Sequence, residues 1–208
     1  MSPSQLLRSS GLAAVLAGAF FILAEILTPI TLLTHPEALS QMALTDRFVI
    51  QSLLTLLGAM LLLAGLVGLY ALQSREAGSL GAFSFSTAFF ITALILGDFY
   101  ANTFVTPTLA SGVPDALDGP YAGVLRLWLP VEFGFLAPAW LPFAVATLRA
   151  RVYRRAAAWL LAAGAVVALV PLPYVNVPFD VSVLWLGIEL MRQSATFSPG
   201  RHLRRTRA

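Results

Sequence analysis

Residues 48–72, FVIQSLLTLLGAMLLLAGLVGLYAL, carry no charged side chain from end to end. An α-helix rises about 1.5 Å per residue, so roughly 20 apolar residues cross the hydrocarbon core of a bilayer. A run of this length and hydrophobicity therefore predicts a membrane-spanning helix. The other apolar segments of the chain repeat the pattern on both sides of this one.

Five further apolar segments flank that helix. The first contains Ala17-Gly18-Ala19, a small-residue pattern typical of signal-peptide cleavage, but its apolar run continues well beyond this point, which favours a retained helix. The last is the shortest and carries Asp180 and Glu189, so we expect it to be tilted or to lie partly at the membrane interface. The six predicted helices cover residues 10–33, 48–72, 82–106, 124–148, 156–175 and 177–191.

The composition agrees with a membrane protein. Hydrophobic residues make up 58% of the chain and charged residues 11%, against roughly 45–50% and about 25% in soluble domains. The mean hydropathy is +0.82. The sequence predicts an all-α, polytopic bundle of about six transmembrane helices in residues 1–195, followed by a basic cytoplasmic tail in residues 196–208.

The arginines predict the orientation of this bundle. All 13 basic residues are arginine, and a cytoplasmic N-terminus places only Arg47 and Arg126 on the outer side. The predicted outer loop at 107–123 carries Asp115 and Asp118 and has no basic residue. Since basic residues in short loops favour the cytoplasm, both termini are predicted to be cytoplasmic. The arginine and alanine excess indicates a GC-rich bacterial genome, so we expect the bacterial cytoplasmic (inner) membrane.

Missing residue types exclude several kinds of chemistry. The chain has no cysteine, which removes disulfides, thiolate metal sites and thiol nucleophiles, and no lysine, which removes retinal bound as a Schiff base. His35 and His202 lie outside the predicted helices, so haem ligation between helices is not expected. Anionic lipid headgroups explain the basic tail, at about 1 kcal/mol per arginine, so nucleic acid is not an expected partner. We expect membrane lipids as partners, no cofactor, no metal site and no catalytic residue set; the oligomeric state is left open.

Acidic residues inside the predicted helices are the main candidates for function. Charge within a bilayer costs several kcal/mol unless it is paired or hydrated. From the predicted midpoints, Glu25, Asp98 and Glu132 lie about 5, 7 and 8 Å outward of the membrane centre, so three helices place acids in one layer. Because ionised carboxylates repel one another, we predict a shared hydrated pocket that takes up a proton or cation. Further candidates near this layer are Asn102, Asp180 and Gln51, with Arg47 and Arg126 as candidate counter-ions.

Prolines and glycines predict local features of the helices. Residues 127–142, LWLPVEFGFLAPAWLP, contain three prolines, each of which removes a backbone donor. We therefore expect a kink or local unwinding next to Glu132. Small residues recur at helical spacing and predict close approach between helix backbones, at Gly11, Gly18, Gly58, Gly65 and Gly68.

Four short stretches suggest a relationship to other membrane proteins. They are SGLAA at 10–14, GLVGLY at 65–70, GAF at 81–83 and RAAAWLL at 155–161. With them the chain resembles a family of small six-helix integral membrane proteins of unknown function from GC-rich bacteria. The resemblance implies a six-helix bundle and no particular activity, substrate or catalytic residue.

The leading hypothesis is a small membrane protein that binds or translocates a proton, cation or small solute through the outer acidic layer. The alternative is a non-catalytic scaffold or accessory subunit in which the acids only pair with arginines. An enzyme acting on lipids ranks third. Carboxylates near an interface could perform acid–base chemistry, but no nucleophile or metal set accompanies them.

Overall fold

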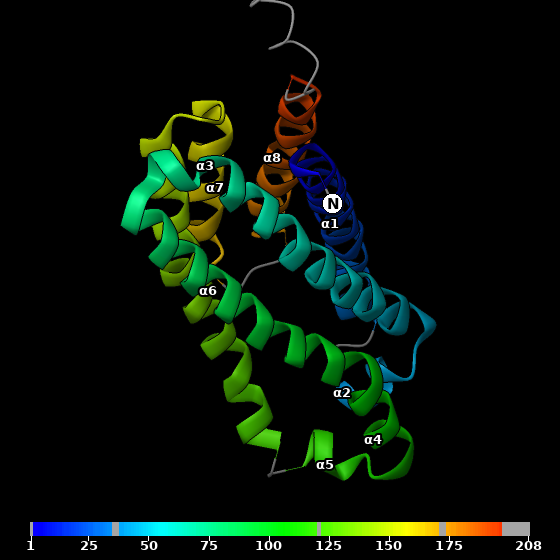
Figure 1. Ribbon diagram of the computed structural model, residues 1–208. Helices are drawn as coiled ribbons and strands as arrows, with labels where there is room; N and C mark the ends of the chain where they lie inside the picture. The colour runs from blue at the N-terminus through cyan, green and yellow to red at the C-terminus, as the bar shows by residue number, and fades with distance from the viewer. Residues whose placement is uncertain (1, 35–37, 120–121, 171–173, 197–208) are drawn as a thin grey trace, which may run out of the picture.

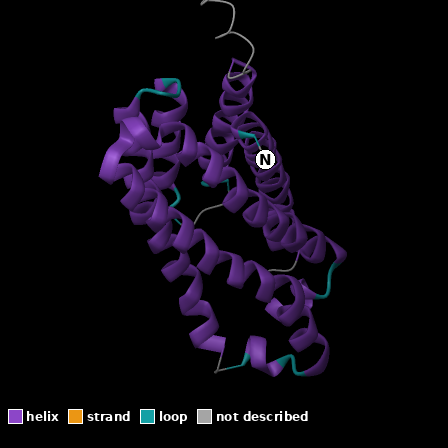
Figure 2. Ribbon diagram, viewed as in Figure 1, coloured by secondary structure: helices purple, strands orange, loops and turns teal. Residues whose placement is uncertain are grey.

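A computed structural model describes the backbone of the whole chain except residues 1, 35–37, 120–121, 171–173 and 197–208. Side chains are described for the same residues, except those at 29–34, 122–133 and 196. The described residues form helices and connecting turns, with no strand among them (Figure 2). The prediction of an all-α protein is confirmed for this part of the chain. The elements are α1 (Pro3–Thr34), α2 (Leu39–Ala43), α3 (Asp46–Tyr100), the π-helix η1 (Ala101–Val105), α4 (Thr106–Gly112), α5 (Asp115–Asp118), α6 (Ala122–Ala150), α7 (Arg155–Val167) and α8 (Val177–Thr196).

Helix α3 consists of two arms that fold back on each other at Gly78. This glycine has φ 56° and ψ −145°, a backbone conformation that side chains disfavour. The rings of Tyr70 and Phe85 stack with centroids 4.5 Å apart, and the Thr103 hydroxyl donates to the Ser52 carbonyl at 3.0 Å. Each pair is almost equidistant from Gly78 along the chain, so the arms are antiparallel (Figure 1).

Successive helical segments alternate in direction (Figure 1). The start of α1, the turn at Gly78, the α6–α7 turn and the last turn of α8 gather at one end of the bundle, while α2, α4 and α5 lie at the opposite end. With only 13 residues, α7 pairs with α8 in a hairpin that extends only part of the way along the bundle. We call the first end the arginine end; it carries Arg8, Arg75, Arg149, Arg151, Arg154, Arg155 and Arg192.

The last two helices differ from their predicted limits. Helix α7 ends at Val167, before the predicted limit at residue 175, and α8 continues to Thr196, past its predicted end at residue 191. Val183, Leu186 and Leu190 of α8 are buried in the core, and the expectation that this helix is tilted or lies partly at the membrane interface stays a prediction. Packing along the length of α1 is what encloses α8.

Glycines allow this close packing, as predicted. A Cβ atom at Gly11 would lie 2.6 Å from Met191 Cγ, and one at Gly18 would lie 2.7 Å from the Asp180 carbonyl oxygen. Both distances are too short for a real side chain, so only glycine lets α1 and α8 approach this closely. The same crowding occurs where α3 meets α1, at Gly58, Gly65 and Gly68.

Helix α6 remains continuous through its prolines. It is helical from Ala122 to Ala150, so the backbone is not unwound next to Glu132, and the kink expected there stays a prediction. In the part of α6 whose side chains are described, Trp140 and Phe143 are fully buried against neighbouring helices. This packing stabilises the helix despite the backbone hydrogen bonds that its prolines remove.

Two helical stretches in the described part of the chain are long and apolar enough to cross a membrane. They are Pro3–Thr28 in α1 and Asp46–Gly112, which comprises α3, η1 and α4. Shorter apolar helices cover Gly134–Ala150 and Arg155–Val167. The described part of the chain is therefore helical and contains two stretches that could span a bilayer.

Candidate functional site

The carboxylate of Glu25, on α1, contacts the turn between α7 and α8. Its Oε1 accepts a hydrogen bond from Asn176 Nδ2 at 2.9 Å, and its Oε2 accepts one from the Tyr174 backbone N–H at 3.2 Å. Both carboxylate oxygens are therefore held by donors of this turn. An acid predicted from the sequence alone thus joins two segments far apart in the chain.

The turn adopts an unusual backbone conformation at this contact. Tyr174 has φ 66°, in the left-handed region that costs roughly 1–2 kcal/mol for a residue other than glycine. Its N–H bonds to Glu25, and its carbonyl accepts a hydrogen bond from the Val177 N–H at 3.2 Å. Strain held in place by specific contacts is typical of functional positions.

Asp180 lies next to this contact, in the first turn of α8. Asp180 is only 3% exposed, and its carboxyl group is within electrostatic range of Glu25. No described group donates a hydrogen bond to Asp180 Oδ2, and the same holds for Asn176 Oδ1. Each buried acceptor without a donor costs about 1–3 kcal/mol, and more if it is charged. We call Glu25, Asn176 and Asp180 the acidic site.

Apolar groups enclose the acidic site on the α8 side. Phe179, which precedes Asp180, packs edge-on against Trp140 of α6 with ring centroids 4.9 Å apart. On α7, a Cβ atom at Gly164 would lie 2.4 Å from the Phe179 backbone nitrogen, so these backbones are in direct contact. Apolar surroundings of this kind strengthen the electrostatic interactions of a buried group such as Asp180.

Asp98, near the end of α3, and Asn102, in the π-helix η1, form a second polar cluster. Asn102 Nδ2 donates to Asp98 Oδ2 at 2.8 Å, so the two side chains lie on the same helix face. Asn102 Oδ1 accepts a hydrogen bond from the Thr106 hydroxyl at 3.4 Å. The cluster thus includes a residue of the π-helix η1, and such helices frequently occur at functional sites.

The other predicted site residues have separate positions. Gln51 Nε2 donates to the Thr28 hydroxyl at 2.8 Å and so connects α3 to α1. Arg47 is exposed and forms no ion pair with any described side chain, so it is not the counter-ion of Glu25 or Asp180 in this structure. Glu132 and Arg126 are on α6, but their side chains lie outside the described residues.

The structure therefore hydrogen-bonds Asp98 to Asn102 and places Asp180 within electrostatic range of Glu25, whereas the single layer of Glu25, Asp98 and Glu132 stays a prediction. Sequence reasoning missed Asn176, which lies at the boundary between the last two predicted helices. A signal was present, because asparagine is favoured immediately before a helix and Asp180 follows one turn later on the same face.

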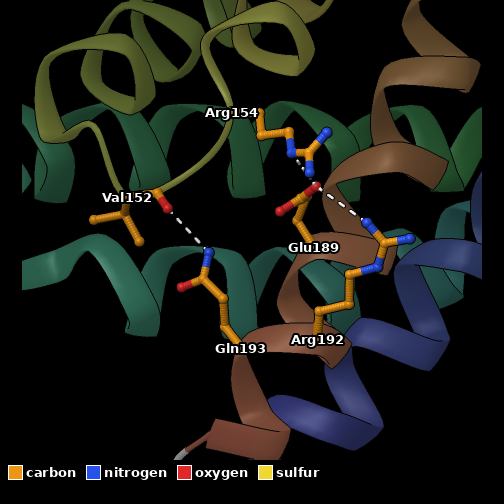
Figure 3. A network of polar contacts seen from close by, with 5 residues as sticks. All are labelled: Val152, Arg154, Glu189, Arg192 and Gln193. Atoms are coloured by element: carbon orange, nitrogen blue, oxygen red, sulfur yellow. Dashed lines mark hydrogen bonds and ion pairs between the residues drawn. The ribbon is translucent and has the colours of Figure 1, made fainter.

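A third cluster contains the two ion pairs formed between described side chains (Figure 3). Arg154 Nε lies 3.2 Å and Arg192 Nη1 lies 3.7 Å from Glu189 Oε1. Both arginines are largely exposed at the arginine end, whereas Glu189 is buried. This arrangement joins the α6–α7 turn to α8 and has the form expected of a structural contact.

Two hydrogen bonds reinforce that contact at the arginine end. Gln193 Nε2 donates to the Val152 carbonyl at 2.9 Å (Figure 3), and the Tyr153 hydroxyl donates to the Leu69 carbonyl at 3.0 Å. Burial raises the pKa of the Tyr153 hydroxyl, which keeps it protonated and able to donate. The α6–α7 turn is thereby fixed to both α3 and α8.

Within the described ranges, no group of three or more His, Cys, Asp or Glu residues could hold a metal ion. No protein-family model matches the chain, and no curated protein or solved structure is significantly similar to it. The chemistry of the acidic site is therefore the feature that bears on function.

Proposed function

We propose that this protein is a multi-pass protein of the bacterial inner membrane that takes up a proton or a small cation at the acidic site. The observation that carries the proposal is the carboxylate of Asp180, which is buried beside Glu25 and whose Oδ2 receives no hydrogen bond from a described donor. A positively charged ligand would compensate both the repulsion between the acids and their loss of hydration.

The outer surface of the bundle supports a membrane location. Large apolar side chains are exposed on several helices, which is unfavourable in water and favourable against lipid. The α1, α6 and α8 helices have 32, 29 and 20 residues, and a span requires about 20. The most exposed large side chains include Phe83 at 65%, Trp159 at 64% and Phe90 at 62%.

The position of the α7–α8 hairpin suggests how a ligand reaches the site. Because the hairpin extends only part of the way along the bundle, its turn faces the end opposite the arginines (Figure 1). Tyr174 and Val170 in this turn are 51% and 47% exposed. In the proposed orientation the arginine end is cytoplasmic, so the ligand would enter from the outer side.

The first prediction concerns this orientation. We expect fusion reporters placed after Ala208 and within the loop around Asp115 to report opposite compartments, with Ala208 cytoplasmic. The physical reason is that seven arginines gather at one end of the bundle, and arginines flanking membrane helices favour the cytoplasm. Reporters that both give the same compartment would contradict the six-span arrangement.

The second prediction concerns ligand uptake. A ligand that binds only the folded protein raises its melting temperature. We expect the full chain in liposomes to gain thermal stability when the pH falls or when sodium replaces choline at constant ionic strength. Asp180→Asn should abolish that dependence, because it removes the unpartnered carboxylate. The control is Asp115→Asn, a change at an exposed residue of α5.

The outcomes of this experiment separate ligand uptake from the scaffold alternative. A protein that only holds helices together would lose stability in Asp180→Asn but would retain the same dependence on pH and sodium. Wild-type protein whose stability responds to neither condition would also contradict the proposed function. The scaffold alternative requires every buried acid to pair with an arginine. Among the described side chains, Glu189 has such partners, Arg154 and Arg192.

A further inference from the structure

The amide of Asn176 determines which way hydrogen bonds run through the acidic site. Its Nδ2 donates to Glu25 Oε1 at 2.9 Å. Its Oδ1 is therefore on the other side of the amide, where it is buried and accepts no hydrogen bond from a described donor. Rotating the amide would place two acceptors against each other at Glu25, so this orientation is the favourable one.

Asp180 lies one helical turn beyond Asn176. Its backbone N–H donates to the Asn176 carbonyl at 2.9 Å, which establishes the helical register between them. Side chains at this spacing share a helix face, with Cβ atoms about 5–6 Å apart. Asp180 Oδ2 and Asn176 Oδ1 are thus two buried acceptors on residues one helical turn apart, and neither has a described donor.

We infer that Asp180 carries a proton in the folded protein and donates it to Asn176 Oδ1, which completes a hydrogen-bonded chain to the Glu25 carboxylate. This inference rests on the proposed function and selects the proton as its ligand. A single O–H group satisfies both acceptors at once. A proton on Glu25 would not do so, because the Glu25 oxygens already accept hydrogen bonds from Asn176 and Tyr174.

In the resulting series of hydrogen bonds, every acceptor has a donor and one negative charge remains. Asp180 donates to Asn176, Asn176 donates to Glu25, and the Tyr174 N–H donates to the second oxygen of Glu25. Uptake adds one proton, forms one O–H bond on Asp180 and leaves one negative charge, on Glu25. Loss of the proton would leave two anions side by side and two acceptors without donors. Protonation therefore holds α1 against the α7–α8 turn.

Ion pairing offers no alternative to the proton among the described side chains. α1 contributes Glu25 to this region, while Asp98 of α3 is hydrogen-bonded to Asn102. Arg155 of α7 and Arg149 of α6 lie at the arginine end. On α8 itself, Arg192 pairs with Glu189, which is about 13 Å further along the helix than Asp180.

The third prediction tests this proton by infrared spectroscopy of the full chain in liposomes at neutral pH. We expect the C=O stretching band of a protonated carboxyl group, and we expect it to shift when aspartate is isotope-labelled at its side-chain carboxyl carbon. Labelling needs no substitution, so this result does not depend on a variant that folds. The band should be lost in Asp180→Asn and retained in the control Asp115→Asn. In Asn176→Leu it should move to the higher frequency of a carboxyl group without a hydrogen-bond acceptor.

Three results would overturn the inference. The first is a wild-type spectrum that lacks the protonated carboxyl band although sodium still stabilises the protein. The site would then bind a metal cation in place of a proton, and the proposed function would stand. The second is a band that does not respond to aspartate labelling, which places the proton on a glutamate. The third is a band unchanged in Asn176→Leu, which breaks the chain to Glu25. Stability that responds to neither pH nor sodium would instead remove the proposed function itself.

Discussion

Trp140→Ala is expected to lower the free energy of unfolding by about 3–5 kcal/mol, the range for removing a large aromatic side chain from a core. Trp140 is fully buried, and its ring packs edge-on against Phe143 and Phe179 with centroids 5.7 and 4.9 Å away. Alanine would leave a cavity where α6 meets α8. The indole N–H has no described hydrogen-bond partner, so the loss would come from packing alone.

The matched control for this fourth prediction is Trp159→Ala. Trp159 is 64% exposed on the outer face of α7, so the same substitution removes little packing within the protein. Unfolding of both variants in detergent micelles, followed by circular dichroism, gives the comparison. Equal losses at Trp140 and Trp159 would contradict the burial of Trp140 in the core.

Hydropathy predicts that these helices exist, because long apolar runs interrupted by polar turns are visible in the sequence. It does not predict where α7 ends, since the residues after Val167 are as apolar as the helix itself. It also ends α8 at residue 191, because the residues that continue the helix to Thr196 are mostly polar. Burial of α8 depends on the glycine-lined face of α1, and hydropathy reports composition without reporting neighbours.

The candidate site, like the fold, combines residues that the sequence reveals with residues that only packing brings together. Glu25 and Asp180 are recognisable in the sequence as acids within apolar helices, and both belong to the acidic site. Their common partner Asn176 is not recognisable in the sequence, because the depth of a residue along its predicted helix does not show which helices are adjacent. The short α7–α8 hairpin brings Asn176 to the level of Glu25. Distances between helices follow from packing, which a single sequence does not contain.

The fifth prediction is that Gly18→Leu costs about 3 kcal/mol of stability, the upper part of the usual range for overpacking a core. A Cβ atom at Gly18 would lie 2.7 Å from the Asp180 carbonyl oxygen and 2.8 Å from the Leu184 backbone nitrogen. These are backbone atoms of a regular helix and cannot turn aside as a flexible side chain could. Leucine would therefore force α1 and α8 apart.

Gly97→Leu is the control, because Gly97 is also within a helix but has no atom within 4 Å of a Cβ placed there. Replacing glycine by a good helix former at such a position should stabilise by up to about 1 kcal/mol. The two variants thus differ in sign, which unfolding in micelles measures directly. Gly18→Leu protein that remains folded should also lose its stabilisation by acid, because separating α1 from α8 withdraws Glu25 from Asn176. Retention of full stability and full acid response in Gly18→Leu would show that contact between α1 and α8 does not assemble the acidic site.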